Sequence, residues 1–339
     1  MNIGPGNPCF IIGEVSCNHA GSLRRAKALV RDCALAGADA VKFQMYSPRS
    51  MTMNVDHPAY RLTDTVWKGQ HLWDLYTMAQ TPTAWLKPLF ALAREYGLVP
   101  FASVFHPDDV WYLDGLGAEL YKIASCEVTW PALVREIADT GKPVILSDGM
   151  ATPEQLGAAL EILGGRAILL RCVSEYPAKP ESYRLQNIRF LANAGTRVGI
   201  SDHTTGTHTA VAAVALGACV VEKHIMSRWY PPWNQTLDRG HSVTPKVFAE
   251  MVRQIREVEA ALALAPRMGQ PGQTGSTWRR RLVFAGPRKA GTILDPSSDI
   301  EVVRCSQGWE PELEERLRGK ILATNVKRGD PVTAKVLLP

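Results

Sequence analysis

Short runs rich in Val, Ile and Leu recur along the first two thirds of the chain. Each run precedes a stretch in which Ala, Leu, Glu and Arg repeat with helical spacing, and this alternation is typical of parallel strands joined by helices. We identify eight runs: Cys9–Val15, Ala40–Gln44, Leu98–Val104, Leu120–Ala124, Pro143–Ser147, Ala167–Arg171, Arg197–Ser201 and Cys219–Lys223. The predicted helices include Leu23–Ala36, Thr83–Tyr96, Pro131–Thr140, Pro153–Ile162 and Thr207–Leu216. Eight strand–helix units in about 265 residues predict an α/β fold of the TIM (β/α)8 barrel type.

Turn residues support this register. The phrases AGADAVKF, LGAELYKI and LGACVVEKH each place a glycine between a predicted helix and the next strand, where it would end the helix. Between the second and third strands, about 50 residues hold YRLTDTVWKGQHLWDLYTMAQTP, whereas such connections usually have about 2–6 residues. We expect this insertion to lie at the top of the barrel as a substrate lid.

The last third of the chain divides differently. After a predicted helix at Val247–Leu264, the sequence APRMGQPGQTGS is rich in Pro, Gly and polar residues, which is typical of a linker. We therefore predict a barrel domain over residues 1–265, a linker over 266–278 and a small β-rich domain over 279–339. About 60 residues are few for a self-sufficient core, so the small domain is expected to dock on another surface.

Charge and composition exclude several classes of protein. The 339 residues include 38 Lys and Arg against 33 Asp and Glu, and the resulting charge of +5 is scattered, which argues against a nucleic-acid partner. No apolar run approaches the roughly 18–20 residues of a membrane span, and the start lacks the plan of a signal peptide. The 7 cysteines include no CxxC pair and indicate reduced thiols. We expect a cytoplasmic protein without a membrane partner.

Polar side chains gather where the predicted strands end, which is where TIM barrels carry their chemistry. Lys42 and Lys122 occupy equivalent positions in two strands, and two inward-facing ammonium groups need an anion. Hydroxyl groups from Ser125, Ser147 and Ser201 would add neutral donors for phosphate or carboxylate oxygens. The pattern predicts a site for a small phosphorylated acid.

His203 and His224 end adjacent predicted strands, which lie about 4.8 Å apart, so their imidazoles can converge on one ion. Glu14 and Asp202 are expected nearby to orient or neutralise the pair. Two histidines among hard oxygen ligands favour Mn²⁺, Mg²⁺ or a similar ion over a closed zinc site. The sequence motifs of nucleotide-binding loops and of hydrolase elbows do not occur in the chain.

Together these motifs resemble the sialic acid synthase family, which makes N-acetylneuraminate and related nonulosonic acids. The resemblance is carried by the segments FIIGEVSCNHAGSLRRAKALV, AGADAVKFQ, LYKIASCEV, TGKPVILSDGMAT, VSEYPA, VGISDHTTG and ALGACVVEKH, with a C-terminal module similar to an antifreeze-like (SAF) domain. It implies a TIM barrel that condenses phosphoenolpyruvate with the open-chain aldehyde of an N-acetylmannosamine-type sugar and releases phosphate. It also implies a divalent ion, Mn²⁺ first and Mg²⁺ or Co²⁺ otherwise, which polarises the aldehyde. Finally, it implies a domain-swapped homodimer in which Arg304 reaches the partner's sugar site.

The resemblance also implies roles for single residues. The phosphoenolpyruvate contacts fall on Lys42, Lys122, Ser125, Ser147 and Ser201. The metal ligands fall on His203 and His224, and the catalytic carboxylate on Glu14. The acceptor-sugar contacts fall on Gln44, Glu127, Tyr176, Glu222, Asp238 and, from the small domain, Arg304.

Departures from the family pattern leave the acceptor open. Val104 stands where a threonine hydroxyl is expected near the phosphate, and Asp148 adds a negative charge close to that site. Trp229, Tyr230 and Trp233 enter an acceptor-side loop and suit either an altered sugar or packing of the loop. The alternatives are therefore a different aldose (phosphorylated, shorter or modified) with the same donor, or a barrel that binds sugar or acts as a scaffold without catalysis.

Overall fold

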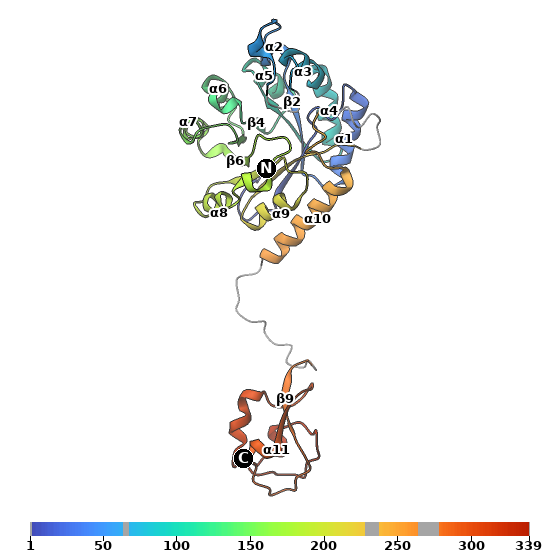
Figure 1. Ribbon diagram of the computed structural model, residues 1–339, viewed down its shortest axis with the longest axis vertical. Helices are drawn as coiled ribbons and strands as arrows, with labels where there is room; N and C mark the ends of the chain where they lie inside the picture. The colour runs from blue at the N-terminus through green and yellow to red at the C-terminus, as the bar shows by residue number, and fades with distance from the viewer. Residues whose placement is uncertain (1, 64–67, 228–236, 264–277, 339) are drawn as a thin grey trace. The chain divides into compact units, whose positions relative to one another are not determined.

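The chain forms two compact units in a computed structural model, Met1–Leu264 and Ala265–Pro339 (Figure 1). The structure describes residues 2–63, 68–227, 237–263 and 278–338. The predicted boundary at residue 265 falls beside the division between the units, while nearly all of the predicted linker, and the loop with Trp229, Tyr230 and Trp233, lie outside the described residues.

The first unit is a closed barrel of eight parallel strands in sequence order, which confirms the predicted TIM barrel. The sheet closes between its first and last strands, where Glu14 pairs with His224 in register. The strands are β1 (Phe10–Glu14), β2 (Ala40–Met45), β3 (Val99–Val104), β4 (Tyr121–Ile123), β5 (Val144–Ser147), β6 (Ala167–Cys172), β7 (Val198–Asp202) and β8 (Val220–His224).

Helices surround the barrel in a ring (Figure 1). They are α1 (Leu23–Leu35), α4 (Thr83–Glu95), α5 (Asp108–Gly115), α6 (Pro131–Asp139), α7 (Pro153–Leu163), α8 (Gln186–Asn193), α9 (His208–Ala215) and α10 (Pro245–Leu262). Gly37, Gly117 and Gly217 follow α1, α5 and α9 with positive φ angles of 84°, 73° and 103°, so the predicted helix-ending turns are confirmed. The insertion after β2 forms the short helices α2 (Pro48–Met51) and α3 (Leu72–Ala79).

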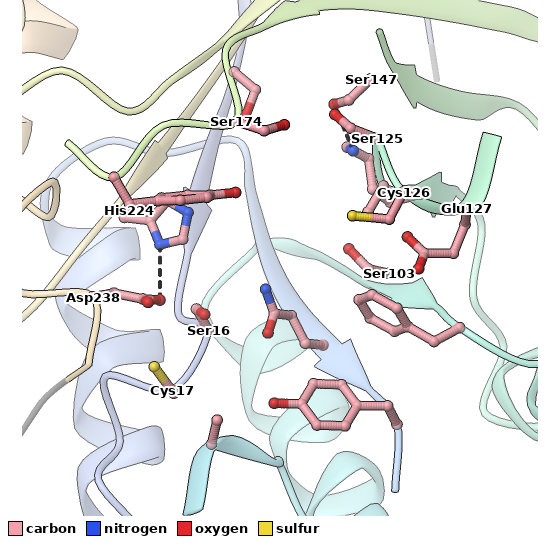
Figure 2. A pocket seen from close by; sticks show the side chains of 18 of the residues that line it. Ser16, Cys17, Ser103, Ser125, Cys126, Glu127, Ser147, Ser174, His224 and Asp238 are labelled. Carbon is pink, nitrogen blue, oxygen red and sulfur yellow. Dashed lines mark hydrogen bonds and ion pairs between the residues drawn. The ribbon is translucent and has the colours of Figure 1, made fainter. Parts of the chain in front are cut away.

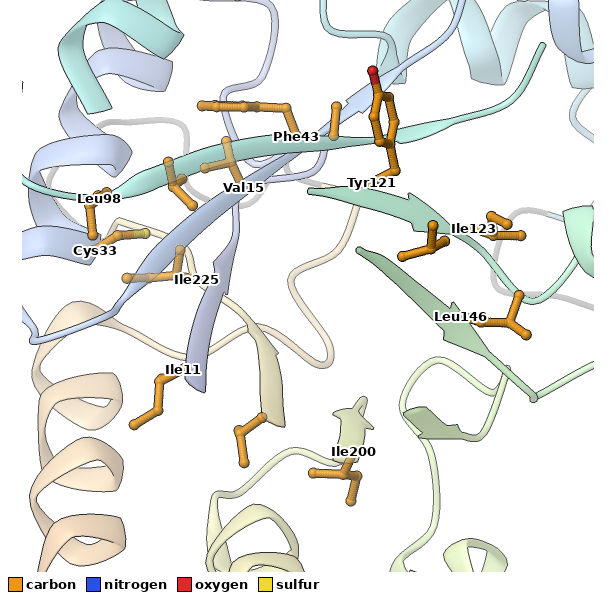
Figure 3. Packing of buried hydrophobic residues seen from close by; sticks show 14 of the residues in the cluster. Ile11, Val15, Cys33, Phe43, Leu98, Tyr121, Ile123, Leu146, Ile200 and Ile225 are labelled. Carbon is orange, nitrogen blue, oxygen red and sulfur yellow. The ribbon is translucent and has the colours of Figure 1, made fainter. Parts of the chain in front are cut away.

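Alternation along the strands sorts side chains into two layers. Ile11, Phe43 and Ile200 belong to the large cluster between barrel and helices (Figure 3), whereas their neighbours with the opposite parity face the barrel interior. The lower interior is apolar and includes Ile12 and Phe101. The same parity directs polar residues inward nearer the carboxyl ends of the strands: Glu14, Lys42, Ser103, Lys122, Ser147, Ser201, Glu222 and His224.

Gly199 gives a test of how tightly the interior is packed. A Cβ atom on Gly199 would lie 2.4 Å from the carbonyl oxygen of Val220 and 2.8 Å from Leu170 Cδ2. We expect Gly199→Ala to lower the free energy of unfolding of the barrel by at least about 1–3 kcal/mol, the usual cost of overpacking, measured by urea unfolding. Gly157→Ala, in α7 where a Cβ meets nothing within 4 Å, is the matched control and should be neutral or stabilising. Equal stability of the two variants would contradict the tight packing.

The second unit is small and β-rich, with an antiparallel pair of strands, β9 (Arg280–Phe284) and β10 (Ile300–Arg304), and the short helix α11 (Pro296–Asp299). It was expected to be too short to build its own core. The structure instead shows a separate buried cluster, which includes Leu282, Phe284, Leu317 and Val332. Tight turns and isolated β-bridges hold the rest of the unit around this cluster.

The described helices include none that combines the length and the apolar character needed to cross a membrane. All seven cysteines are free thiols, and five of them are buried.

Candidate active site

A cavity of about 510 Å³ opens at the carboxyl ends of the strands. Most residues predicted for the site line it, whereas Glu14 does not, and Arg304 belongs to the second unit. The predicted residues that line it are Lys42, Gln44, Lys122, Ser125, Glu127, Ser147, Tyr176, Ser201, His203, Glu222, His224 and Asp238. Figure 2 shows His224 and Asp238 on one side and Ser103, Ser125, Glu127 and Ser147 across from them.

The insertion after β2 forms an apolar part of the cavity wall. Met51, Leu62, Leu72, Leu75 and Tyr76 all line the cavity. The segment expected to be a lid therefore contributes directly to the site. Its apolar side chains lie in the same cavity as the charged groups of the barrel interior.

Lys42 is held by carboxylates. Its Nζ lies 2.7 Å from Glu14 Oε2 and 3.5 Å from Glu222 Oε2, and it donates to Ser103 Oγ at 3.0 Å. Burial alone would lower the pKa of Lys42, but Glu14 and Glu222 outweigh burial and raise it. Lys42 therefore stays charged, and much of its charge is already balanced. Ser201 is engaged in the same network, because its Oγ donates to Glu222 Oε1 at 2.9 Å.

Lys122 differs from Lys42, although the sequence presents the two as equivalent. Its Nζ donates to Ser147 Oγ at 2.7 Å and to the carbonyl oxygen of Ile123 at 3.0 Å. Among the described residues, no carboxylate lies within ion-pair distance of it. Burial lowers the pKa of Lys122, and a bound anion would favour its charged form again. Lys122 is thus the ammonium group best placed to receive an anionic ligand.

Hydroxyl groups continue this anion-binding surface. Ser125 Oγ accepts from the backbone N–H of Gly149 at 3.1 Å, and Ser174 also lines the cavity. A Cβ on Gly149 would lie 2.7 Å from Ser174 Oγ and 2.9 Å from Ser125 Oγ, so only glycine leaves these hydroxyl groups undisturbed.

The negative charge that Asp148 is expected to add close to this surface is balanced by its partners. Asp148 Oδ2 accepts from Arg171 Nη1 at 2.7 Å, and Oδ1 accepts from the backbone N–H of Cys172 at 2.8 Å. The side chain therefore ties the end of β5 to β6. Val104 likewise belongs to the outer hydrophobic cluster and not to the cavity lining.

His203 is fixed by its neighbours. Its Nδ1 donates to the carbonyl oxygen of Val173 at 2.8 Å, which leaves the lone pair on Nε2. Burial lowers the pKa of His203 and keeps the ring neutral, as a metal ligand requires. The ring of Tyr176 lies against it, with centroids 4.5 Å apart.

His224 lies beside Asp238 and His241. His224 Nδ1 is 3.2 Å from Asp238 Oδ2, and the ring centroids of His203 and His224 are 5.3 Å apart, so the predicted histidine pair does converge. Atoms of His224, Asp238 and His241 lie within 4.8 Å of one another, in a geometry that could hold a metal ion. Sequence reasoning missed His241, because it lies in a turn beyond β8 and follows no strand pattern.

Asp202 does not take the role expected of it. It pairs with Lys223 Nζ at 3.1 Å, and both side chains are fully buried. Strand alternation explains the difference, because Asp202 and Lys223 have the parity opposite to Ser201 and Glu222, which face the cavity. Asp202 therefore joins β7 to β8 outside the barrel interior.

Glu127 is the carboxyl group whose acidity suits proton transfer at neutral pH. It begins a short 3₁₀ turn after β4 and lines the cavity, and its Oε2 is buried without a hydrogen-bond partner among the described residues. Burial raises the pKa of Glu127 to about 7, although nearby Lys122 opposes the rise.

Comparisons with known proteins agree with this geometry. Residues 29–265 match the NeuB family. The pseudaminic acid synthase of Campylobacter jejuni is 35% identical over 327 residues, which cover 95% of this chain and 94% of that protein. The N-acetylneuraminate-9-phosphate synthase of Mus musculus is 28% identical over 344 residues, which cover 97% of this chain and 93% of that protein.

A solved structure is similar as well. The N-acetylneuraminic acid (sialic acid) synthetase of Leptospira borgpetersenii superposes with a TM-score of 0.70 at 29% identity, and the match covers 80% of this chain and 90% of that one. The expected resemblance to the sialic acid synthase family is confirmed for the barrel, and the chain belongs to the NeuB family.

Proposed function

We propose that this chain is a nonulosonic acid synthase that condenses phosphoenolpyruvate with an open-chain, N-acetylmannosamine-like aldose and releases phosphate. The observation that carries the proposal is Lys122, an ammonium group in the cavity without a carboxylate partner among the described residues, beside the hydroxyl of Ser147. Family membership and the similarity to the pseudaminic acid and N-acetylneuraminate-9-phosphate synthases support the same reaction class.

The donor and the acceptor take different parts of the cavity in this proposal. The phosphate and carboxylate of phosphoenolpyruvate contact Lys42, Lys122, Ser125, Ser147 and Ser201, which supply cations and hydroxyl groups. The aldose lies against the side chains that accept hydrogen bonds from a polyol or pack on its ring: Gln44, Glu127, Tyr176, Glu222 and Asp238.

The cavity suits a divalent ion at His203 and His224. Both rings lie at the cavity, His203 carries its lone pair on Nε2, and His224 Nδ1 has no hydrogen-bond partner within the described chain. When bound there, Mn²⁺ or a similar ion would supply Lewis acidity to the aldehyde.

Glu14 acts through Lys42 in this proposal. It was expected to be the catalytic carboxylate, but it is fully buried, pairs with Lys42 and does not line the cavity. Its role is thus to position the Lys42 ammonium. Glu127 is one of the carboxyl groups that line the cavity, and as a carboxylate it would take a proton from the water that adds to C2 of the donor.

The acidity of Glu127 predicts how turnover depends on pH. A base with a pKa of about 7 in the free protein is ionised above that pH, so kcat/KM should fall as the pH drops through about 7. Glu127→Gln should lower kcat by about 100-fold or more and should flatten this acid limb. The measurement is a pH–rate profile of phosphate release for both proteins. An unchanged acid limb in Glu127→Gln would contradict the role of Glu127 as base.

We further propose that the protein works as a homodimer in which the second unit brings Arg304 to the partner's acceptor site. Arg304 is exposed at the end of β10, with its guanidinium carbon 5.8 Å from the centroid of the Trp278 ring. Sedimentation and kinetics of Arg304→Ala check this arrangement. The variant should raise KM for the aldose and leave KM for phosphoenolpyruvate unchanged, whereas a fully active monomer would contradict it.

A panel of aldoses tests the function as a whole. The protein is incubated with Mn²⁺, phosphoenolpyruvate and each aldose, led by N-acetylmannosamine and including phosphorylated, shorter and diacetamido sugars, and released phosphate is measured. We expect release only when both substrates are present. Release with a different aldose would select the alternative acceptor, and tight binding of a sugar without turnover of any aldose would favour the non-catalytic alternative.

A further inference from the structure

Within the part of the chain that the structure describes, three buried side-chain atoms in one cluster lack hydrogen-bond partners: His224 Nδ1, Asp238 Oδ2 and His241 Nε2. The first two form an ion-pair contact of 3.2 Å, and His241 Nε2 lies 3.8 Å from Asp238 Oδ1, which is too long for a hydrogen bond. The three residues are only 6%, 8% and 1% exposed, respectively. Leaving buried polar atoms unpartnered costs free energy, and a ligand that contacts all three would recover it.

The backbone holds this cluster in place. Val243 N–H donates to the carbonyl oxygen of His224 at 2.9 Å, and this places the turn over residues 238–242 beside the end of β8. Within the turn, Ser242 Oγ donates to the carbonyl oxygen of Asp238 at 2.7 Å. Asn18, from the connection after β1, donates to Ser242 Oγ at 2.9 Å and to the carbonyl oxygen of Ile225 at 3.0 Å. Asp238 and His241 are therefore fixed against His224.

Aromatic rings enclose His241 within the cluster. Its ring centroid lies 4.5 Å from that of His224, 4.8 Å from that of Tyr176 and 5.5 Å from that of His203. Imidazole nitrogens and carboxylate oxygens are both ordinary ligands of divalent metal ions, and those of His224, Asp238 and His241 lie within 4.8 Å of one another.

We propose that Asp238 and His241 join His224 as direct ligands of the divalent ion, so that this cluster alone supplies two imidazoles and one carboxylate from adjacent segments. This ligand set rests on the proposed function in one respect, namely that an ion binds at His224. It adds Asp238 and His241 to the pair of histidines, His203 and His224, expected from the sequence. Imidazole-rich sites suit Zn²⁺, Co²⁺ and Fe²⁺, whereas Mg²⁺ takes oxygen ligands. The site should therefore bind Co²⁺ and Zn²⁺ much more tightly than Mg²⁺, with further positions open to substrate oxygens.

Titration of the metal-free protein with Co²⁺, followed by visible absorption and calorimetry, tests the ligand set without reference to turnover. Since losing even an outer-shell partner costs about 10–100-fold in metal affinity, His241→Ala and Asp238→Asn should weaken Co²⁺ binding by at least about 100-fold and change the spectrum. His208→Ala, which removes an exposed histidine on α9, is the matched control and should bind as the wild type does.

Melting of the metal-free proteins checks that each variant folds, and His241→Asn, which keeps a buried polar group, serves if His241→Ala does not. Wild-type Co²⁺ affinity and spectrum in a folded His241 variant would overturn the proposal. Phosphate release is assayed in parallel, so that the two claims can fail separately. Synthase activity with unchanged Co²⁺ binding in the His241 variant would remove His241 from the ligands and keep the proposed function. If the wild type turns over no aldose but the His241 variant loses Co²⁺ binding, the proposed function is removed and His241 is kept among the ligands.

Discussion

Lys122→Met should lower kcat/KM for phosphoenolpyruvate by at least about 100-fold, as expected when one charged contact to a reacting anion is removed. The reason is geometric, since Lys122 Nζ lies in the cavity with Ser147 Oγ and a carbonyl oxygen as its neighbours, and no described carboxylate balances its charge. Steady-state kinetics with each substrate varied in turn measure the effect. KM for the aldose should change little.

The control for this variant is Lys246→Met, which removes an exposed ammonium group on α10. Lys42→Met would be a poor control, because it leaves Glu14 buried without its partner, and breaking a buried pair in this way costs about 3–5 kcal/mol of stability. A folded Lys122→Met protein with wild-type affinity for phosphoenolpyruvate would contradict the anion site.

His224→Ala should remove metal-dependent phosphate release, by about 1000-fold or more if Lewis-acid catalysis supplies several kcal/mol. His224 is common to the histidine pair at the cavity and to the cluster with Asp238 and His241, so its loss affects every arrangement of ligands considered for the ion. The rate is measured in chelator-treated buffer to which Mn²⁺ or Co²⁺ is then added back.

The comparison for this second variant is His106→Ala, which removes a histidine whose side chain is 37% exposed and which does not line the cavity. It should retain the activity of the wild type and the response to added metal. Full activity of His224→Ala in chelator-treated buffer would refute the metal assignment, whatever the acceptor.

Strand alternation explains why the barrel and much of the site could be predicted from the sequence. Apolar runs with a polar end identify all eight strands, and the barrel then brings Lys42, Lys122, Ser147 and Glu222 to one cavity. The helix-ending glycines fix where strands begin. These signals are local in the sequence, so they can be recognised without knowledge of side-chain contacts.

What could not be predicted depends on which partner each side chain meets. Asp202 pairs with Lys223 because both side chains point outward from β7 and β8. A shift of one residue in the predicted register would have pointed both side chains into the barrel. Asp148, just after β5, pairs with Arg171 in the adjacent strand β6. This contact depends on the side-chain rotamers and cannot be derived from the spacing of the residues in the sequence. His241 lies in an irregular turn, and the spacing of Asp238 and His241 in LDRGH was the one available signal.

The balance of charge around the two lysines was hidden for the same reason. Lys42 and Lys122 occupy equivalent strand positions, but Glu14 and Glu222 both lie near the first. Only the structure shows that one lysine is paired and the other is available to an anion. The two lysines therefore differ in how far their charge is balanced, although both lie in the cavity as predicted.

The central claim is that this cavity joins the three carbons of phosphoenolpyruvate to an aldose. Incubation with ¹³C-labelled phosphoenolpyruvate, Mn²⁺ and the aldose that supports phosphate release, followed by mass spectrometry, tests it directly. The account predicts a new acid whose mass is that of the aldose plus one labelled pyruvate, formed in step with phosphate. Labelled pyruvate that stays free while phosphate is released would contradict it, because the protein would then hydrolyse the donor without forming a carbon–carbon bond.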